Sequence, residues 1–185
     1  DVEASERGNS TYFPGHVIPM LPEVLSNGIC SLQEGVPRLC KSAFIVYDDS
    51  VRPVRSRFAN TIIKSRKRLR YREAQDIIDG KDEIYHTDGP KKIGDYEPEV
   101  IDLLKKMNAL SKRIQKRRHA AGQLVLNLPK MELVLNEEGK VTDAVPEDES
   151  FTHTLIEMFM VEATEAVARL LDVLAVSYTH LTLPT

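Results

Sequence analysis

The chain has little cysteine, and this scarcity excludes two kinds of protein. Only Cys30 and Cys40 occur among 185 residues. Two cysteines are too few for a disulfide framework, and their spacing does not give a Cys-x-x-Cys metal site. We therefore expect free or buried thiols in a protein that resides in a reducing compartment.

Long apolar runs are also missing. No segment reaches the roughly 20 consecutive apolar residues that a membrane-spanning helix needs. The first residues do not show the basic-then-apolar order of a secretory signal peptide. We expect a soluble, cytoplasmic protein that does not engage a membrane.

Catalytic signatures are equally scarce. The five histidines suggest no Ser/His/Asp relay, and no glycine-rich loop is present to cradle a phosphate. Asp48 and Asp49 are the only adjacent aspartates, and we interpret them as a turn, because a metal site would need further ligands. Asp76, Asp79 and Asp82 have near-helical spacing, but a glycine interrupts that helix, so we expect solvated charges. The sequence therefore assigns no catalytic residue and no metal ligand.

Charge is unevenly distributed along a chain whose net charge is only −3. Residues 51–72 contain nine basic residues and no acid, and residues 105–118 contain seven more, again without an acid. Compensating acids gather at 137–149. Segregated basic blocks fit a local surface that binds a polyanion. The alternative is a pair of solvated helix or strand faces.

The order of the expected elements predicts an α+β fold, strand-rich in its first half and with two long helices in its second half. The length of the chain suits one domain. The shorter elements are expected as strands at 43–47 and 55–63 around a turn at 48–50, a helix at 71–78, a loop at 81–94 and a hairpin around 136–139.

The first long helix is expected to begin at Pro98 and to stop near Gly122, because proline suits a first turn and glycine suits a helix end. Its basic residues should lie opposite an apolar stripe formed by Val100, Leu103, Leu104, Met107, Leu110 and Ile114. The second should begin near Ser150, with a capping box from Thr154 to Glu157. We expect its buried stripe to contain Leu155, Phe159, Ala163, Val167, Leu170 and Leu174.

The most specific pattern lies between Arg7 and Leu39. It reads Arg-Gly-Asn-Ser-Thr-Tyr-Phe-Pro, then Ile-Pro-Met-Leu-Pro, then Leu-Ser-Asn-Gly-Ile-Cys-Ser-Leu, and closes on Arg-Leu. Its prolines fix their own φ and restrict the preceding residues, which favours a stiff, shaped connection over a flexible linker. The order and spacing resemble the RNB catalytic domain of the RNase R and RNase II exoribonucleases.

The resemblance extends beyond this pattern through residues 62–80, 110–128 and 155–168. Three residues depart from the family pattern and put the fine tuning of the site in doubt, namely Lys130, Met158 and Thr164. We expect a partial RNB catalytic domain over 1–176. We interpret residues 177–185 as an unmatched tail that arose as an artefact or a truncation scar.

The resemblance implies processive hydrolysis of single-stranded RNA from its 3′ end to nucleoside 5′-monophosphates by a monomeric enzyme that uses Mg²⁺. Hard cations suit this reaction because they activate a water and neutralise the leaving oxygen. In the family, an aspartate-rich segment that holds the metal lies shortly before the tyrosine-proline pattern. We therefore expect the chain alone to be inactive.

The same resemblance implies residues that handle RNA. Tyr12 matches a family tyrosine that stacks near the terminal bases, a contact worth about 1–3 kcal/mol per base; the alternative is a tyrosine packed under its own loop. Arg7 and Arg38 are expected either to contact phosphates or to cap local backbone. The basic end of the first long helix is expected to line the approach of the RNA with Lys112, Arg113, Lys116, Arg117 and Arg118. Glu157 is interpreted as structural.

Two other functions stay open. One is an RNA-binding or regulatory protein built on a degenerate nuclease scaffold, which the presence or absence of the upstream aspartates would decide. The other is a helical interaction module with a purely structural role. Salt-dependent binding to single-stranded RNA would argue against that module.

Overall fold

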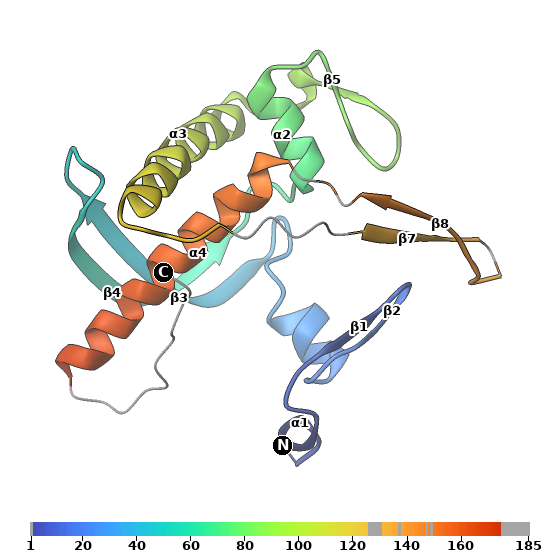
Figure 1. Cartoon of the computed structure of the whole chain (residues 1–185), viewed down its shortest axis with the longest axis horizontal. Coiled ribbons are helices and arrows are strands. Elements are labelled where there is room, and N and C mark those ends of the chain that lie inside the picture. The colour runs from blue at the N-terminus through green and yellow to red at the C-terminus, as the bar shows by residue number, and fades with distance from the viewer. Residues whose placement is uncertain (1, 126–130, 137, 147, 149, 175–185) are drawn as a thin grey trace. The chain divides into compact units, whose positions relative to one another are not determined.

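The computed structural model describes residues 2–125, 131–136, 138–146, 148 and 150–174 (Figure 1). Contacts divide the chain into two compact units. The first contains Asp1–Arg38, Ile63–Ser65 and Asn127–Asp148, and the second contains Leu39–Ile62, Arg66–Leu126 and Glu149–Thr185. The tail at 177–185 and the departure at Lys130 lie outside the described residues, so both stay sequence-based interpretations.

The first unit is built from short elements. They are α1 (Val2–Arg7), β1 (Thr11–Phe13), β2 (His16–Ile18), a π-helix (Val24–Ile29), β7 (Met131–Leu135) and β8 (Val141–Pro146). β1 pairs with β2, and β7 pairs with β8, each as an antiparallel hairpin. The side chain of Asn136 closes the second hairpin by accepting hydrogen bonds from the backbone N–H groups of Glu138 (3.1 Å) and Lys140 (2.9 Å). The hairpin expected around residues 136–139 is confirmed.

The second unit combines a long two-stranded ribbon with three helices (Figure 1). Its elements are β3 (Pro37–Tyr47), β4 (Pro53–Lys64), α2 (Tyr71–Asp79), β5 (Glu83–Ile84), β6 (Lys91–Lys92), a 3₁₀ turn (Ile93–Asp95), α3 (Pro98–Ala120) and α4 (Phe151–Val173). The first residues of β3 and the last of β4 belong to the first unit. The expected α+β class is confirmed. The expected loop at 81–94 is corrected, because it contains the small β5–β6 pair.

Two apolar clusters hold the second unit together. One joins the ribbon to the long helices through Val51, Ile114 and Met158, with Tyr47 and Leu110 packed against them. The other joins α2 to the segment before α3. It contains Ile77, Ile84 and Tyr96, flanked by Leu69, Ile93, Ile101 and Leu104. Ile77, Ile84 and Ile114 have no exposed surface. Burial of apolar side chains such as these stabilises the folded unit.

The ends of α2 follow from its sequence. Glu73 lies in the first turn, and its carboxylate accepts a hydrogen bond from the backbone N–H of Arg70 at 3.1 Å. The same carboxylate accepts the hydroxyl of Tyr96 at 2.7 Å. Gly80 ends the helix with φ of +72°, a left-handed conformation that favours glycine. The expected helix and its glycine stop are confirmed.

The expected buried face of α4 is confirmed at Leu155, which is 2% exposed, and is wrong toward the C-terminal end of the helix. The residues that are buried on this helix are Thr152, Leu155, Met158, Val161, Glu162 and Ala166. Of the expected stripe, Val167, Leu170 and Leu174 are 41%, 37% and 59% exposed. The helix carries apolar residues all around, so its periodicity does not single out one face. The capping box at Thr154 is also wrong, because the helix already begins at Phe151.

The expected bounds of α3 are close to the observed ones, since it begins at Pro98 and ends at Ala120. Ile114 is fully buried as expected, whereas Leu103 is 57% exposed and does not belong to the packed stripe. No helix in the described part of the chain combines the length and apolarity needed to cross a membrane.

Candidate nucleic-acid interface

Tyr12 lies on a short hairpin and is open to solvent. It pairs with Val17 between β1 and β2, and the hairpin turns at Gly15, whose φ is +72°. The Tyr12 side chain is 77% exposed and the neighbouring Phe13 is 53% exposed. The alternative in which Tyr12 packs beneath its loop does not agree with this exposure. An exposed ring on a fixed turn has the geometry that stacking on a nucleic-acid base requires.

Arg7 holds the base of this hairpin. Its guanidinium forms an ion pair with Glu3 one turn earlier and donates a hydrogen bond to the backbone carbonyl of Pro19 at 2.5 Å. The backbone N–H of Met20 donates to the Ser10 hydroxyl at 2.9 Å beside it. The structure thus shows Arg7 capping local backbone, one of the two expected roles, and contact with phosphate stays a prediction.

Arg38 is engaged in the same way. Its guanidinium donates to the carbonyl oxygens of Ser31 (2.8 Å) and Gly28 (3.2 Å), and to the side-chain oxygen of Gln33 (3.0 Å). These bonds tie the start of β3 to the end of the π-helix. A fourth bond, at 3.3 Å, goes to the carbonyl of Pro37. These four bonds use donors of the Arg38 guanidinium that an RNA phosphate would otherwise accept. Its role toward RNA stays a prediction.

The basic end of α3 divides into exposed and engaged side chains. Lys116 is exposed, and Lys112 is exposed with its ammonium 5.1 Å from the ring centre of Phe151. Arg113 is exposed and donates to the backbone carbonyl of Asp49 at 2.5 Å. These three cations can still meet a polyanion at the surface, whereas Arg117 points inward.

Glu162 of α4 is the centre of a buried polar network. Its carboxylate accepts the Tyr47 hydroxyl at 2.9 Å and pairs with the guanidinium groups of Arg117 and, at 3.4 Å, Arg118. The Glu162 side chain is 2% exposed. Burial, and next the hydrogen bond to Glu162, raise the pKa of Tyr47 well above its usual range. A buried carboxylate requires such partners, because an isolated buried charge is very costly.

The network continues toward the surface and into the ribbon. Arg118 also pairs with Glu165 at 2.6 Å, and Glu165 pairs with Arg169 one turn later at 2.9 Å. Arg117 donates to the carbonyl of Val51 at 2.5 Å. Sequence reasoning placed Arg117 on an RNA-facing surface. In the structure Arg117 ties α3 to α4 and to the tip of the β3–β4 ribbon, and its contact with RNA stays a prediction.

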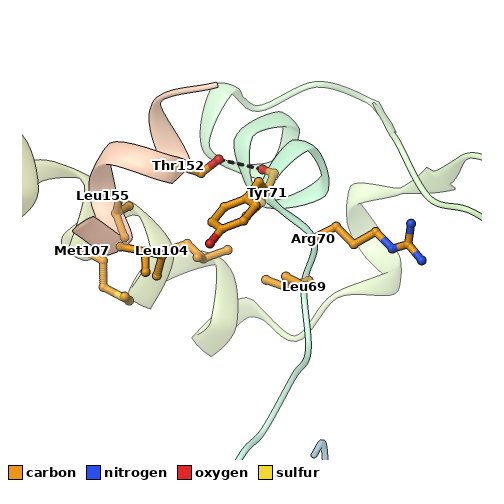
Figure 2. Close-up of a pocket in the computed structure, with 9 residues that line it drawn as sticks. Leu69, Arg70, Tyr71, Leu104, Met107, Thr152 and Leu155 are labelled. Atoms are coloured by element: carbon orange, nitrogen blue, oxygen red, sulfur yellow. Dashed lines mark hydrogen bonds between the residues drawn. The ribbon is translucent and has the colours of Figure 1, made fainter. Parts of the chain in front are cut away.

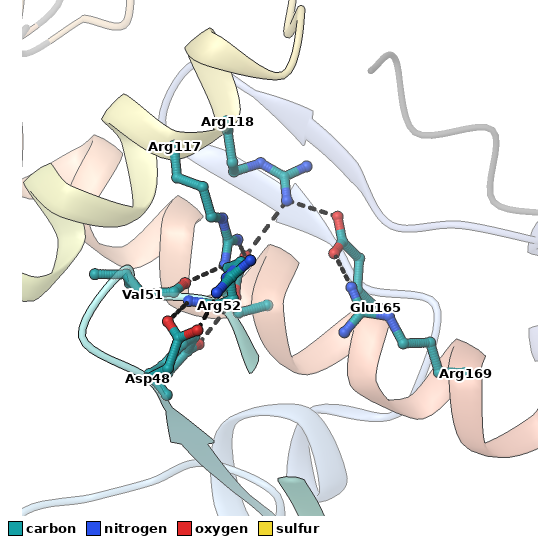
Figure 3. Close-up of polar contacts among 9 residues, drawn as sticks. Asp48, Val51, Arg52, Arg117, Arg118, Glu165 and Arg169 are labelled. Carbon is teal, nitrogen blue, oxygen red and sulfur yellow. Dashed lines mark hydrogen bonds and ion pairs between the residues drawn. The ribbon is translucent and has the colours of Figure 1, made fainter. Parts of the chain in front are cut away.

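That ribbon tip is the turn expected at Asp48. The Asp48 carboxylate accepts backbone N–H groups from Ser50 (2.9 Å) and Arg52 (2.8 Å), and its other oxygen pairs with the Arg52 guanidinium at 2.9 Å (Figure 3). The backbone bond from Arg52 is the main reason that the pKa of Asp48 is lowered. The turn interpretation is confirmed. Val51 adopts φ of +59°, a strained position for a β-branched residue, and its buried side chain compensates.

The structure corrects the expectation for the environment of Asp76. It was expected to be a solvated charge, yet its side chain is 8% exposed and pairs with Lys81 at 2.6 Å. Its second oxygen accepts the backbone N–H of Tyr85 at 2.9 Å. Burial raises the pKa of Asp76, but the bonds from Lys81 and Tyr85 outweigh it and leave the pKa below its usual value. Asp76 therefore stabilises the α2–β5 connection.

A small apolar pocket opens between α2, α3 and α4 (Figure 2). Its volume is about 120 Å³, and its lining consists of Leu69, Arg70, Tyr71, Ala74, Leu104, Met107, Thr152, Leu155 and Ile156. The Thr152 hydroxyl donates to the Tyr71 carbonyl at 2.8 Å, and the Tyr71 ring stacks on His153 at 3.7 Å between centres. Sequence reasoning missed this pocket, because its lining comes from three segments far apart in the chain.

The described residues do not fit a resident metal ion. They contain no group of three or more histidine, cysteine, aspartate or glutamate side chains that could hold one. Mg²⁺ prefers clustered oxygen ligands, and the described residues do not supply such a cluster.

Comparisons with known proteins identify relatives over most of the chain. The family model described as RNB domain matches residues 1–184. Ribonuclease R of Thermotoga maritima is 36% identical over 173 residues, which cover 93% of this chain and 23% of the relative. Ribonuclease R of Escherichia coli K12 is 31% identical over 172 residues, covering 93% of this chain and 20% of the relative. The chain thus spans less than a quarter of the length of these curated relatives.

Solved structures of ribonucleases also match most of this chain. RNase R of Mycoplasma genitalium in complex with ribose-methylated single-stranded RNA matches with a TM-score of 0.81 and 30% identity, covering 93% of this chain and 25% of that one. The same protein in complex with double-stranded RNA matches with a TM-score of 0.83 and 30% identity, over 95% and 30%. The Dss1 exoribonuclease of Candida glabrata, at 16% identity and a TM-score of 0.76 over 95% and 23%, shares the fold.

Proposed function

Because this chain belongs to the RNB domain family, we propose that it is part of a ribonuclease of the RNase R type. In this proposal the longer protein shortens single-stranded RNA from its 3′ end and releases nucleoside 5′-monophosphates. Relatives named Ribonuclease R, at 31–36% identity over 93% of the chain, support the type of enzyme. Solved relatives in complex with RNA support the partner.

The observation that carries the RNA-binding part is the exposure of Tyr12. Its ring is 77% exposed at a hairpin held by Arg7 and by the Ser10–Met20 bond. A rigid aromatic surface binds any base by stacking, so it suits an enzyme that degrades RNA of every sequence. In this proposal Tyr12 stacks near the 3′ end, while Lys112, Arg113 and Lys116 attract the phosphate backbone.

A divalent metal ion, Mg²⁺ by family resemblance, is part of the proposal. When bound, such an ion activates a water and neutralises the leaving oxygen of a phosphodiester. Because the described residues offer no group that fits it, we propose that its ligands belong to another part of the protein. The 185-residue chain by itself is then inactive, and the contribution of this chain is to bind and orient RNA.

The alternative is an RNA-binding or regulatory protein on a nuclease scaffold. It would use the same exposed Tyr12 and basic side chains without hydrolysis.

Cytoplasmic location and a monomeric state complete the main proposal. Size-exclusion chromatography with light scattering checks the monomer, and fluorescence microscopy of a tagged protein checks the location.

The test uses an RNA oligonucleotide labelled at its 5′ end. The 185-residue chain, and the same chain joined in frame to its flanking coding sequence, are each incubated with this RNA in Mg²⁺ or in EDTA. We expect the longer protein to shorten the RNA processively from the 3′ end only with Mg²⁺, and the 185-residue chain to leave it intact. Binding without shortening by the longer protein would favour the regulatory alternative. Internal cleavage, or shortening by the 185-residue chain, would contradict the proposal.

A further inference from the structure

The middle of β3 is apolar without interruption. Residues 43–47 read Ala-Phe-Ile-Val-Tyr. A strand in an antiparallel sheet with one solvated face alternates apolar and polar residues, because successive side chains point to opposite faces. A continuous apolar run instead is typical of a strand that is buried on both faces. We therefore expect both sides of the β3–β4 ribbon to be covered by other polypeptide segments.

One side of the ribbon is covered within this chain. The Tyr47 hydroxyl bonds to the Glu162 carboxylate of α4 at 2.9 Å, so Tyr47 points toward that helix. Because side chains alternate, Ala43 and Ile45 lie on the same side. Ala43 and the α4 residue Ala163 line one groove, which agrees with this placement. Helix α4 therefore packs on the side of the ribbon to which Tyr47, Ala43 and Ile45 point.

The opposite side is open in the described residues. Phe44 and Val46 alternate with the covered residues and are 44% and 50% exposed. The guanidinium of Arg57 lies 4.5 Å from the ring centre of Phe44, so Arg57 shares their side, and Arg55 does so by alternation. Both arginines are exposed, and no ion pair is found for either among the residues that the structure describes. Phe44, Val46, Arg55 and Arg57 form what we term the outer face.

We propose that a further polypeptide segment of the same protein covers the outer face, with apolar side chains against Phe44 and Val46 and a carboxylate beside Arg55 or Arg57. This inference rests on the proposed function, in which the chain is part of a longer protein. The aligned regions of the solved relatives make up only 25–30% of those chains, so such proteins have ample further polypeptide. Charge complementarity selects an acidic segment, because every charge on the outer face is positive.

RNA is a weaker occupant of this surface. The arginines suit phosphates, but a polyanion gains little from the aliphatic side chain of Val46. Sheets in α+β domains are covered by further elements wherever their faces are apolar, and burying such side chains is a main source of folding stability. Phe44 and Val46 are therefore side chains of the kind that a covering polypeptide segment would bury.

The experiment places a single thiol on the outer face. The variant C30S/C40S/V46C is made both in the 185-residue chain and in the longer protein that includes its flanking coding sequence, and the rate of reaction with a maleimide is measured. We expect the thiol to react rapidly in the 185-residue chain and far more slowly in the longer protein, with full reactivity restored in urea. A second variant, F44D, should lower the melting temperature of the longer protein by several degrees and leave that of the 185-residue chain nearly unchanged.

Each other outcome overturns the inference. Rapid reaction in the folded longer protein would show that the outer face is solvated. Protection of the 185-residue chain that appears only when an RNA oligonucleotide is added, and disappears in R55E/R57E, would assign the face to RNA. Protection that depends on protein concentration would assign it to a second copy. Nuclease activity is measured on the same samples, so a protected but inactive protein would count against the proposed function alone.

Discussion

The regions around Tyr12 and Glu162 differ in their exposure to solvent and in the sequence separation of the residues that their hydrogen bonds join. The region around Tyr12 is exposed, and its bonds join residues close in sequence, such as Arg7 to Pro19 and Ser10 to Met20. The region around Glu162 is buried, and its bonds join residues far apart, such as Tyr47 to Glu162. The difference separates a surface that is available for a ligand from a network that is needed for the fold.

This comparison has an energetic consequence. A substitution in an exposed region without special contacts changes stability little. Removing one partner of a buried ion pair leaves an uncompensated charge and is strongly destabilising. Stability and RNA binding should therefore respond to different residues. Four substitutions test that separation, and their expected effects on stability decrease in the order given.

The largest effect on stability is expected for E162A. It leaves Arg117 without the carboxylate with which it pairs among the described residues, and the Tyr47 hydroxyl without its acceptor. We expect a loss of about 3–5 kcal/mol in the free energy of unfolding, measured by urea denaturation. The matched control is E165A, whose carboxylate is 26% exposed and whose loss should cost about 1 kcal/mol or less. Equal losses in the two variants would show that the network has no buried centre.

D76N should have the next largest effect. It weakens the acceptor for Lys81 and for the backbone of Tyr85, which we expect to cost about 2 kcal/mol at neutral pH. Because the folded-state pKa of Asp76 is lowered, its contribution is present above the ordinary carboxyl pKa of about 3.9 and is lost as the pH falls through the folded-state value. Unfolding curves at several pH values should show the gap between wild type and D76N narrowing below about pH 4. A gap independent of pH would contradict this assignment.

Y47F removes one hydroxyl and keeps the ring. The ring stays packed against the cluster of Val51, Ile114 and Met158, whereas the 2.9 Å bond to Glu162 is lost. We expect the free energy of unfolding to fall by about 1–1.5 kcal/mol, as measured by thermal melting. In the E162A background the same substitution should have almost no effect, since its partner is already gone. Additive losses would argue against a direct bond.

Y12A should change stability least, by about 0.5 kcal/mol or less, since Tyr12 is 77% exposed. The same urea denaturation experiment provides the measurement. A loss as large as that of E162A would mean that Tyr12 supports the fold, and the comparison between the two regions would then fail.

The sequence predicted those features that depend on neighbouring residues. Pro98 and Gly80 placed the ends of two helices, and Asp48 placed the turn at the ribbon tip, because proline, glycine and aspartate act on their own backbone. The pattern between Arg7 and Leu39 pointed to a family that the comparisons confirm. Features of this kind need no knowledge of the tertiary contacts.

The sequence did not predict features that depend on distant residues. Glu162 is buried because Tyr47, Arg117 and Arg118 meet it from three other positions in the chain, and no local signal marks a paired buried glutamate. The face of α4 was misassigned for the same reason, since an apolar helix takes its orientation from its neighbours. The RNA-binding roles expected for Arg7, Arg38 and the basic end of α3 stay predictions.

The most direct test of the central claim is the affinity of the chain for single-stranded RNA with and without the Tyr12 ring. Fluorescence anisotropy of a labelled oligonucleotide is measured with wild type, Y12A and the control V17A, whose side chain is 42% exposed on the same hairpin. Loss of one stacked base is worth about 1–3 kcal/mol, so Y12A should bind about 5- to 150-fold more weakly while V17A stays near wild type. If Y12A binds RNA as tightly as wild type, Tyr12 does not contact the RNA and the proposed interface is wrong.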